Sequence, residues 1–447
     1  MATSLTQGNP ARLIITFALP MMLGNVFQML YNMADVIIVG RTLGVDALAG
    51  VGLTGPLGFM FISLVIGMTH GFSILCAQCF GAQNKAALRR TFCASIVLGI
   101  AIAILIALAS NLVEPALRLT NAPPKAFEPA KAYLTTMLLG SGCMVFYNIF
   151  SSSITALGDS RTPLVFLIFT CILNVGLDFL FILGFKLGTA GAALATSVAL
   201  GISAILCFIY IWRRIPELRP HKNDWRYLNL TLFKKLIALG LPMGLQGATI
   251  NIGFIIVQSV LNTLGAEAVA ACSSAACIDS IALMPMVSLG RAMSTYVGQN
   301  VGAKRPDRVR QGVRDASLIV FVYAWLAALI CILLATPMIS IFVGDGQELV
   351  VTLGKRLLSI QCGLYWLLGL LFVIRSSLQG MGRSLITTIS SFLELVMRCS
   401  AAIFLVGPLG FDAICMASPL AWIGAMLILI PSYLIWRKKL LSQKAEA

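Results

Sequence analysis

The chain has 447 residues, of which 59% are hydrophobic and only 11% are charged, and its mean hydropathy is +0.93. Soluble globular domains are about half apolar and about a quarter charged, so this composition excludes an ordinary soluble enzyme, a disordered chain and a nucleic-acid-binding domain. The net charge of +15 does not restore the last class, because the basic residues cluster in short loops between apolar runs.

Apolar runs of membrane-spanning length follow one another along the chain. A helix needs about 20 apolar residues to cross the hydrocarbon core of a bilayer. Segments of this kind lie at residues 13–39, 50–78, 92–113, 131–157, 163–185, 189–212, 233–263, 269–297, 315–343, 355–380, 384–406 and 410–436. The sequence therefore predicts an all-α polytopic membrane protein with twelve transmembrane helices.

The loops between these segments alternate in charge. Of the 32 lysines and arginines, 22 lie at the two ends and in the loops after every second segment, 7 lie in the other loops and 3 lie inside segments. Cytoplasmic loops carry the excess of basic residues. We therefore expect a multi-pass protein of the plasma membrane, here a bacterial inner membrane, with both termini in the cytoplasm.

The two halves of the chain repeat each other. LPMMLGNVFQ matches LPMGLQGATI, AQCFGAQNK matches GQNVGAKRP, and ALGDSRTP matches LQGMGRSL. Equivalent residues are about 222 positions apart, as for Pro20 and Pro242. Because each half holds an even number of spans, the halves are parallel repeats, as in transporters that place substrate at the repeat interface. We predict an N-lobe at 1–212, a cytoplasmic linker at 213–235 and a C-lobe at 236–447.

Ionisable residues inside the spans are rare, and such residues usually face a cavity or a polar partner. Four oxygen-bearing side chains of the first half fall at similar depth, namely Asp35, Asn174, Asp178 and Thr196. Hard cations take oxygen ligands, and a buried carboxyl group can carry a proton, so this set suits H⁺ or Na⁺. Alternatively, each acid bonds a neighbouring helix as a structural contact.

The second half has a different set of charges. Glu394 and Arg398 are four residues apart on one predicted helix, where they can form a buried salt bridge, and Arg375 lies on the preceding span. This cluster is either a self-satisfied structural unit or a substrate contact. Asp279 either lines the cavity or bonds a helix neighbour.

The motifs LPMMLGNVFQMLYNMADVIIVGRTLG, AQCFGAQNK, GQNVGAKRP, ALGDSRTP and LQGMGRS resemble those of the multidrug and toxic compound extrusion (MATE) family, over nearly the whole chain. The resemblance implies two six-helix lobes that export organic compounds against H⁺ or Na⁺ entry. In the DinF-like branch of that family, a cation site in the N-lobe matches Asp35, Asn174, Asp178 and Thr196. The residues matching the branch's bending proline and cavity side chains are Pro20, Tyr31, Tyr133 and Asn148.

We therefore expect a cation-coupled antiporter for amphipathic, often cationic compounds, not an enzyme. It would act as a monomer in the lipid bilayer on small drug-like substrates, with no nucleic-acid partner and no cofactor beyond the coupling ion. One alternative is a lipid-linked oligosaccharide flippase of the same superfamily. Another is a channel or receptor, which the two-lobe repeat disfavours because a pore does not need alternating access.

Overall fold

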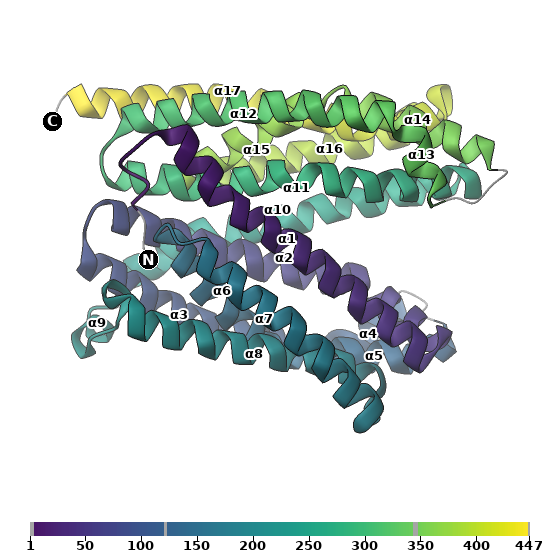
Figure 1. Ribbon diagram of the computed structural model, residues 1–447, viewed down its shortest axis with the longest axis horizontal. Coiled ribbons are helices and arrows are strands. Elements are labelled where there is room, and N and C mark those ends of the chain that lie inside the picture. The colour runs from purple at the N-terminus through teal and green to yellow at the C-terminus, as the bar shows by residue number, and fades with distance from the viewer. Residues whose placement is uncertain (1–3, 120–122, 343–346, 446–447) are drawn as a thin grey trace. The chain divides into compact units, whose positions relative to one another are not determined.

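The computed structural model describes residues 4–119, 123–342 and 347–445, and every regular element in these ranges is a helix (Figure 1). Within these ranges, ten helices are long and apolar enough to cross a membrane, and two bent pairs raise the number to 12 if each pair is one span. Lipid offers no hydrogen-bond partners, so a spanning segment must satisfy its backbone groups internally, as a helix does. The predicted twelve-helix architecture is confirmed.

The first half of the chain provides six spans and the linker helices. The spans are α1 (Pro10–Leu43), α2 (Val45–Gly81), α3 (Lys85–Leu108) continued by η1 (Ala109–Leu112) and α4 (Val113–Leu119), the pair α5 (Pro124–Leu139) and α6 (Ser141–Ala156), α7 (Arg161–Asp178) continued by the π-helical η2 (Phe179–Gly184), and α8 (Gly188–Arg214). The linker holds η3 (Pro216–Leu218) and α9 (Lys222–Arg226).

The second half provides the other six spans. They are α10 (Leu230–Asn262), α11 (Ala266–Gly302), α12 (Pro306–Leu333) followed by the short α13 (Ala335–Ser340), the pair α14 (Glu348–Cys362) and α15 (Tyr365–Gly380), α16 (Ser384–Leu409) and α17 (Phe411–Ala445).

The sequence repeat reappears in the backbone of equivalent turns. Gly44, between α1 and α2, has φ 85°, and its counterpart Gly265, between α10 and α11, has φ 100°. A side chain is disfavoured at such angles, which explains why both turns contain glycine. Gln83 and Lys304, in the next pair of equivalent turns, share φ values of 56° and 54°. The two halves therefore have the same backbone conformation at the turns after their first and second spans.

Two spans are broken where their sequences remain continuously apolar. α5 and α6 meet at Gly140 with a bend of 45°, and α14 and α15 meet near the equivalent Gly363 with a bend of 49°. A Cβ atom at Gly140 would lie 2.1 Å from Ser197 Oγ, so α8 approaches the break too closely for any side chain. Hydropathy alone predicts a straight helix at both places, because it does not register a close helix contact.

The chain divides into two compact units whose borders fall near the equivalent prolines. Unit 1 contains Pro20–Gly244, and unit 2 contains Leu5–Leu19 and Leu245–Ala447. The first turns of α1 therefore belong to unit 2 and the rest of α1 to unit 1. In α10 the order is reversed, with the change two residues after Pro242. Proline interrupts helix hydrogen bonding, so both helices change unit where they are easiest to bend.

Unit 1 is built around α2, α5, α6 and α8, which pack against one another and bury one large apolar cluster that includes Phe72 and Phe92. The start of α10 also packs on α2 within this unit. A Cβ at Gly71 would lie 2.5 Å from the Cα of Gly240. This approach is possible only because both residues are glycine, as in the small-residue contacts of other membrane helices.

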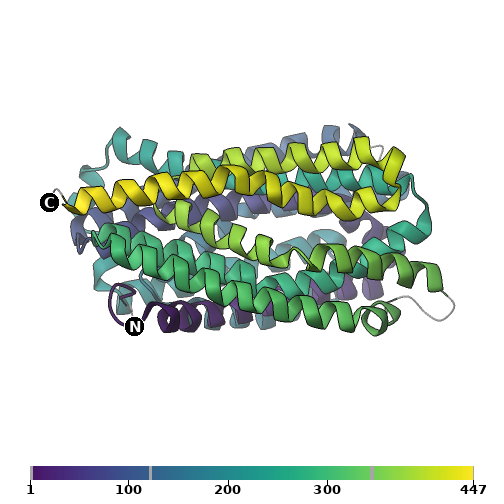
Figure 2. The same ribbon diagram turned by 90° about the horizontal axis from the view of Figure 1, so that it is seen from above.

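Unit 2 is built around α11, α12, α15, α16 and α17, with α14 beside α11 (Figure 2). α16 and α17 form its most extensive helix pair. Tyr296 and Tyr365 are its largest fully buried side chains. The hydroxyl group of Tyr296 donates to the carbonyl oxygen of Arg308 at 3.1 Å, so this buried polar group is satisfied by the neighbouring helix.

Each unit also fixes a non-membrane connecting segment by polar contacts, the linker after α8 in unit 1 and the N-terminal segment before α1 in unit 2. In unit 1, Arg89 Nε on α3 lies 2.8 Å from Asp224 Oδ2 in the linker. Although partial burial opposes ionisation, hydrogen bonds from the His221 backbone and from Arg89 lower the pKa of Asp224 below its ordinary value. In unit 2, Gln299 Oε1 accepts from the backbone of Leu5 at 2.9 Å. Both connecting segments are thus held by specific polar contacts.

Candidate cation and substrate sites

In unit 1, the structure brings together the four side chains that the sequence groups as a cation site. Asn174 and Asp178 lie one turn apart on α7, and both side chains are fully buried. Asp178 is the last residue before the π-helical η2. Helices of this wider kind occur often at functional sites, and the change of pitch places the Asp178 carboxylate at a break in the regular helix.

The Asn174 amide connects the other members of the set. When its nitrogen faces α1, that nitrogen donates to Asp35 Oδ1 at 2.7 Å and the amide oxygen accepts from the Thr196 backbone at 3.2 Å. The Thr196 hydroxyl lies 3.4 Å from the same amide and also interacts with Asp35. Side chains from α1, α7 and α8 therefore meet at one point.

The carboxylate of Asp178 is the exception in this well-bonded group. Neither of its oxygens receives a hydrogen bond from any donor in the described part of the chain. Its neighbour is the carboxyl group of Asp35, which is itself an acceptor when ionised. A buried carboxylate and a half-buried one repel each other strongly when they are adjacent and both ionised. A proton or a metal cation between them removes that repulsion and supplies the missing partner.

Two tyrosines border the acid pair, whereas the other two predicted residues, Asn148 and Pro20, make no hydrogen bond to it within the described ranges. Tyr31 and Tyr133 are electrostatic neighbours of both acids, and the Tyr31 hydroxyl interacts with Thr196. Asn148 donates instead to the carbonyl oxygen of Met144 on its own helix, at 2.8 Å. Pro20 lies on α1, four turns before Asp35.

The oxygen set is suited to a hard cation. Across the described residues, no three His, Cys, Asp or Glu side chains converge as they would at a transition-metal site. Two carboxylates, one amide and one hydroxyl are ligands that Na⁺ accepts, and the carboxylates alone suffice for a proton. The coupling role of this set stays a prediction, which the geometry supports.

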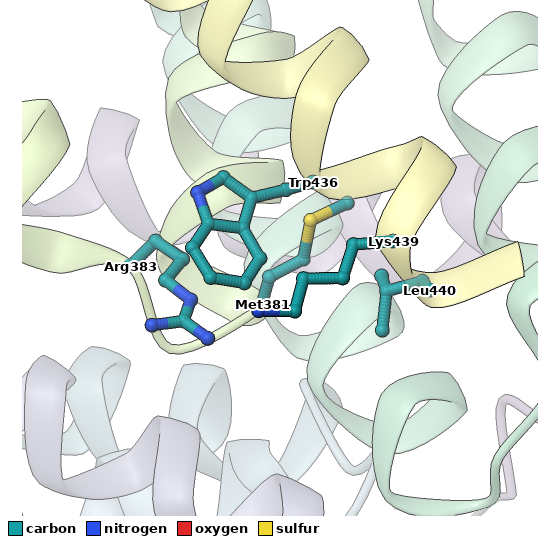
Figure 3. Close-up of a pocket in the computed structure, with 5 residues that line it drawn as sticks. All are labelled: Met381, Arg383, Trp436, Lys439 and Leu440. Carbon is teal, nitrogen blue, oxygen red and sulfur yellow. The ribbon is translucent and has the colours of Figure 1, made fainter. Parts of the chain in front are cut away.

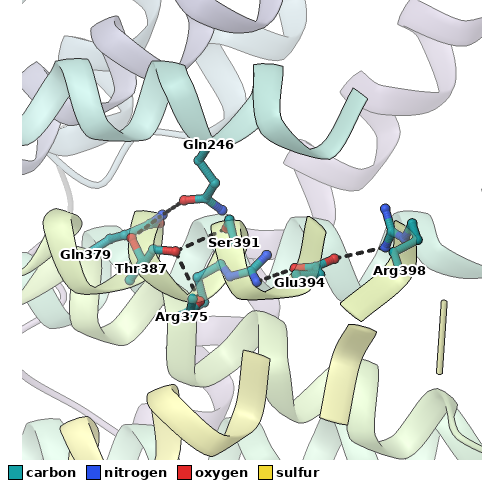
Figure 4. A network of polar contacts seen from close by, with 8 residues as sticks. Gln246, Arg375, Gln379, Thr387, Ser391, Glu394 and Arg398 are labelled. Atoms are coloured by element: carbon teal, nitrogen blue, oxygen red, sulfur yellow. Dashed lines mark hydrogen bonds and ion pairs between the residues drawn. The ribbon is translucent and has the colours of Figure 1, made fainter. Parts of the chain in front are cut away.

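Unit 2 contains a buried ion cluster with the opposite excess of charge (Figure 4). Arg375 on α15 donates to Glu394 Oε2 at 2.6 Å, and Arg398 donates to Glu394 Oε1 at 3.0 Å. All three side chains are at most 6% exposed. The predicted salt bridge between Glu394 and Arg398 is therefore present, and Arg375 joins it from the neighbouring helix.

The cluster is not fully satisfied by its own members. One carboxylate between two guanidinium groups leaves one positive charge in excess. The Nε atoms of Arg375 and Arg398 have no hydrogen-bond partner within the described ranges. The Arg398 guanidinium instead lies 4.5 Å from the ring centroid of Phe254, a cation–π contact. Nearby, Gln379 donates to Gln246 at 3.0 Å, which extends the polar region onto α10.

Asp279 on α11 has a partner that the sequence did not reveal. The buried hydroxyl group of Tyr365 donates to its carboxylate. Tyr365 begins α15, directly after the bend in the tenth span. The sequence left two roles open for Asp279, lining the cavity or bonding a neighbouring helix, and the structure shows the bond to a neighbouring helix. In the sequence, Tyr365 is noticeable only as a polar hydroxyl group within an apolar segment. That feature does not show which residue the hydroxyl group bonds.

The fold and these sites define a multi-pass membrane protein of two repeated halves, with ionisable groups buried inside each half. The MatE family model matches the chain twice, at residues 20–180 and 242–403. The two matches coincide with the two sequence repeats. The chain therefore belongs to the MatE family, the multidrug and toxic compound extrusion transporters, whose members are transporters and not enzymes.

Relatives with printed functions support the same family. The chain is 30% identical to the probable multidrug resistance protein YoeA of Bacillus subtilis, over 85% of this chain and 83% of that protein. It is 26% identical to an FAD transporter of Shewanella oneidensis, over 86% of each. A solved multidrug resistance MATE transporter in an outward-facing conformation has the same fold, with a TM-score of 0.88 and 24% identity over 99% of this chain and 98% of that one.

Proposed function

We propose that this transporter is a cation-coupled antiporter that exports amphipathic, often cationic organic compounds by alternating access, with its coupling site in the N-lobe. The observation that carries this proposal is the fully buried Asp178 carboxylate beside Asp35, without a donor in the described part of the chain. A site that lacks a positive partner has a physical reason to take up a proton or Na⁺ from the membrane gradient.

Occupation of the site changes the charge of unit 1 by one elementary charge in a poorly hydrated place. Such a change shifts an equilibrium between conformations only if the two conformations hold the cation with different affinity. α1 supplies both Asp35 and Pro20, so bending at the proline would move one carboxylate relative to the others. Cation uptake and bending of α1 then favour the same conformation. The rigid bodies that move during transport are the two lobes predicted from the repeat.

Coupling is tested by efflux from proteoliposomes that carry a pH gradient alone, a sodium gradient alone, or neither. We expect efflux with one gradient and none without a gradient. Asp178→Asn should abolish gradient-driven efflux, whereas Asp46→Asn, an exposed acid at the start of α2, should not change it. Full efflux by Asp178→Asn would place the coupling site elsewhere.

The proposed orientation has both termini and the basic loops in the cytoplasm of a bacterial inner membrane. It is supported by the concentration of 22 basic residues on one side. Cysteines introduced near Lys222 and Lys304 should resist an impermeant thiol reagent added to intact cells. A cysteine near Lys186, on the opposite side, should react and serves as the control.

A second candidate substrate class consists of compounds that carry an anionic group, which includes the lipid-linked substrates of the flippase alternative. The specific observation in its favour is the excess positive charge of the cluster of Arg375, Glu394 and Arg398. The similarity to a protein named as an FAD transporter agrees with it, because FAD carries phosphate groups. Counterflow with an organic cation and with a flavin nucleotide in the same proteoliposomes would separate the two classes.

A further inference from the structure

A small pocket lies in unit 2 between the turn that joins α15 to α16 and the end of α17 (Figure 3). The turn between α15 and α16 forms one wall and the last turns of α17 form the other. Its volume is about 150 Å³, and its lining residues are Met381, Arg383, Trp436, Lys439 and Leu440. A cavity of this volume can hold a molecule the size of benzene.

Two cations share the indole ring in this pocket. The guanidinium carbon of Arg383 lies 3.4 Å from the ring centroid of Trp436, and the Lys439 ammonium nitrogen lies 4.9 Å from it. The ring face attracts cations and holds both groups at one place. No carboxylate is present among the described residues that line the pocket. The two positive charges therefore face the same space without a compensating acid in its lining.

The equivalent place in unit 1 is built differently, although the sequence repeat gives it the same basic and aromatic residues. Arg161 corresponds to Arg383 and Trp212 to Trp436. At the position of Met381, however, unit 1 has Asp159. This acid accepts hydrogen bonds from the backbone of Arg161 at 3.1 Å and from the Tyr210 hydroxyl at 3.2 Å. The first turn thus contains its own negative charge, and the second does not.

In the proposed orientation the pocket falls at the cytoplasmic end of the last candidate span, the level at which lipid phosphate groups occur. Tryptophan prefers the boundary between the bilayer and water, and basic pockets between helices on the cytoplasmic side bind lipid head groups. Trp436 belongs to the final candidate span, and the neighbouring residues Arg437 and Lys438 add to the basic character of this end. Met381 and Leu440 provide an apolar wall for the carbon atoms next to a phosphate.

We propose that this pocket binds a phosphate anion, carried by an anionic phospholipid head group or free in solution. Arg383 offers a planar group with several donors, which matches phosphate oxygens, and Lys439 offers a mobile positive charge. Partial desolvation lowers the pKa of Arg383 below its ordinary value, and a bound anion compensates for that desolvation. None of its five lining residues belongs to the set of Asp35, Asn174, Asp178 and Thr196 or to the cluster of Arg375, Glu394 and Arg398.

The test is a titration of the full-length protein, purified in a zwitterionic detergent, with three separate probes. They are phosphatidylglycerol, phosphatidylcholine and inorganic phosphate, with bound lipid counted by native mass spectrometry and phosphate binding measured by calorimetry. The variants are Arg383→Gln, Lys439→Gln and the double variant. Arg161→Gln is the matched control, because it removes the equivalent arginine from the turn that contains Asp159.

We expect phosphatidylglycerol to bind more tightly than phosphatidylcholine. Each pocket variant should weaken binding by roughly fivefold, the double variant by more than tenfold, and Arg161→Gln should have no effect. Binding of phosphatidylglycerol alone identifies a lipid site, and binding of inorganic phosphate alone identifies a site for free phosphate. Equal binding of both lipids with no binding of inorganic phosphate, or equal losses in Arg161→Gln and Arg383→Gln, would overturn the proposal. Lys439 is exposed on the surface of α17, so its variant tests the site even if Arg383→Gln folds poorly.

Discussion

The two halves share a fold but not a charge pattern. Unit 1 places the half-buried Asp35 and the buried Asp178 beside an amide and a hydroxyl group, whereas unit 2 buries one acid between two arginines. At the repeat offset of 222, the unit 2 charges Arg375, Glu394 and Arg398 correspond to uncharged residues of unit 1, and Asp178 corresponds to a serine. The repeat therefore preserves the order of the packed helices, whereas the positions of the charged side chains inside them differ between the halves.

The difference also predicts opposite responses to the removal of an acid. In unit 2 the carboxylate neutralises two cations, so its loss leaves buried charge without a partner. In unit 1 the carboxylates repel each other, so neutralising one of them relieves the repulsion. A charge that the fold needs is structural, and a charge that the fold tolerates without a partner is a candidate for function.

The largest expected effect is the loss of stability in Glu394→Gln. Removing one member of a buried ion cluster typically costs about 3–5 kcal/mol, because the remaining charges are left unpaired. The matched control is Asp412→Asn, which breaks a partly exposed ion pair with Arg356 in the same unit and should cost less than about 1 kcal/mol. Thermal unfolding in detergent measures both, and equal melting temperatures would show that the cluster is not structural.

The second prediction concerns the acid pair of unit 1. Asp35→Asn and Asp178→Asn should each abolish coupled efflux, while their melting temperatures stay equal to that of the wild type or rise. The reason is that each change removes the repulsion and the cation-binding charge together. If Asp178→Asn unfolds as early as Glu394→Gln, the carboxylate is a structural contact and the contrast between the units fails.

A smaller effect is expected at the prolines where α1 and α10 change unit. Pro20→Ala should retain cation binding but lose efflux several-fold, because a restored helix hydrogen bond opposes bending. Pro242→Ala should change efflux much less, since α10 carries no acid of the coupling site. Cation affinity and efflux are measured on the same preparations. Equal loss in both variants would mean that bending is not specific to α1.

The smallest effect compares the two connecting segments. Asp224→Asn should destabilise unit 1 by about 1 kcal/mol at pH 7, since it removes a charge-assisted hydrogen bond to Arg89. Because the pKa of Asp224 is lowered in the folded protein, its contribution is complete above the ordinary pKa of about 4 and disappears as the pH falls through the folded value.

The control for this pH dependence is Gln299→Met, which removes a neutral contact to Leu5 in unit 2. Its cost should stay constant as the pH falls from 7 to 3, whereas that of Asp224→Asn should begin to decrease below the ordinary aspartate pKa of about 4. Unfolding curves at several pH values check both. Parallel curves for Asp224→Asn and the wild type down to pH 3 would contradict the role of the ion pair.

The sequence by itself determined the class of protein, the twelve spans and the repeat. These follow from composition, from run length and from residues at a constant offset, all of which are local or periodic properties of the chain. It also indicated the set of Asp35, Asn174, Asp178 and Thr196, because ionisable and polar residues inside apolar runs are rare enough to stand out.

Only the tertiary structure decided which buried polar groups have hydrogen-bond partners and which residues those partners are. Arg375 reaches Glu394 across 19 residues, and Tyr365 reaches Asp279 across 86, so neither contact follows from helical spacing. The bend at Gly140 depends on the close approach of Ser197, and the pocket at Trp436 depends on a turn that passes the end of α17. Hydropathy reports how much each segment avoids water, but a hydrogen-bond partner is set by how helices pack, and that is known only when the chain has folded.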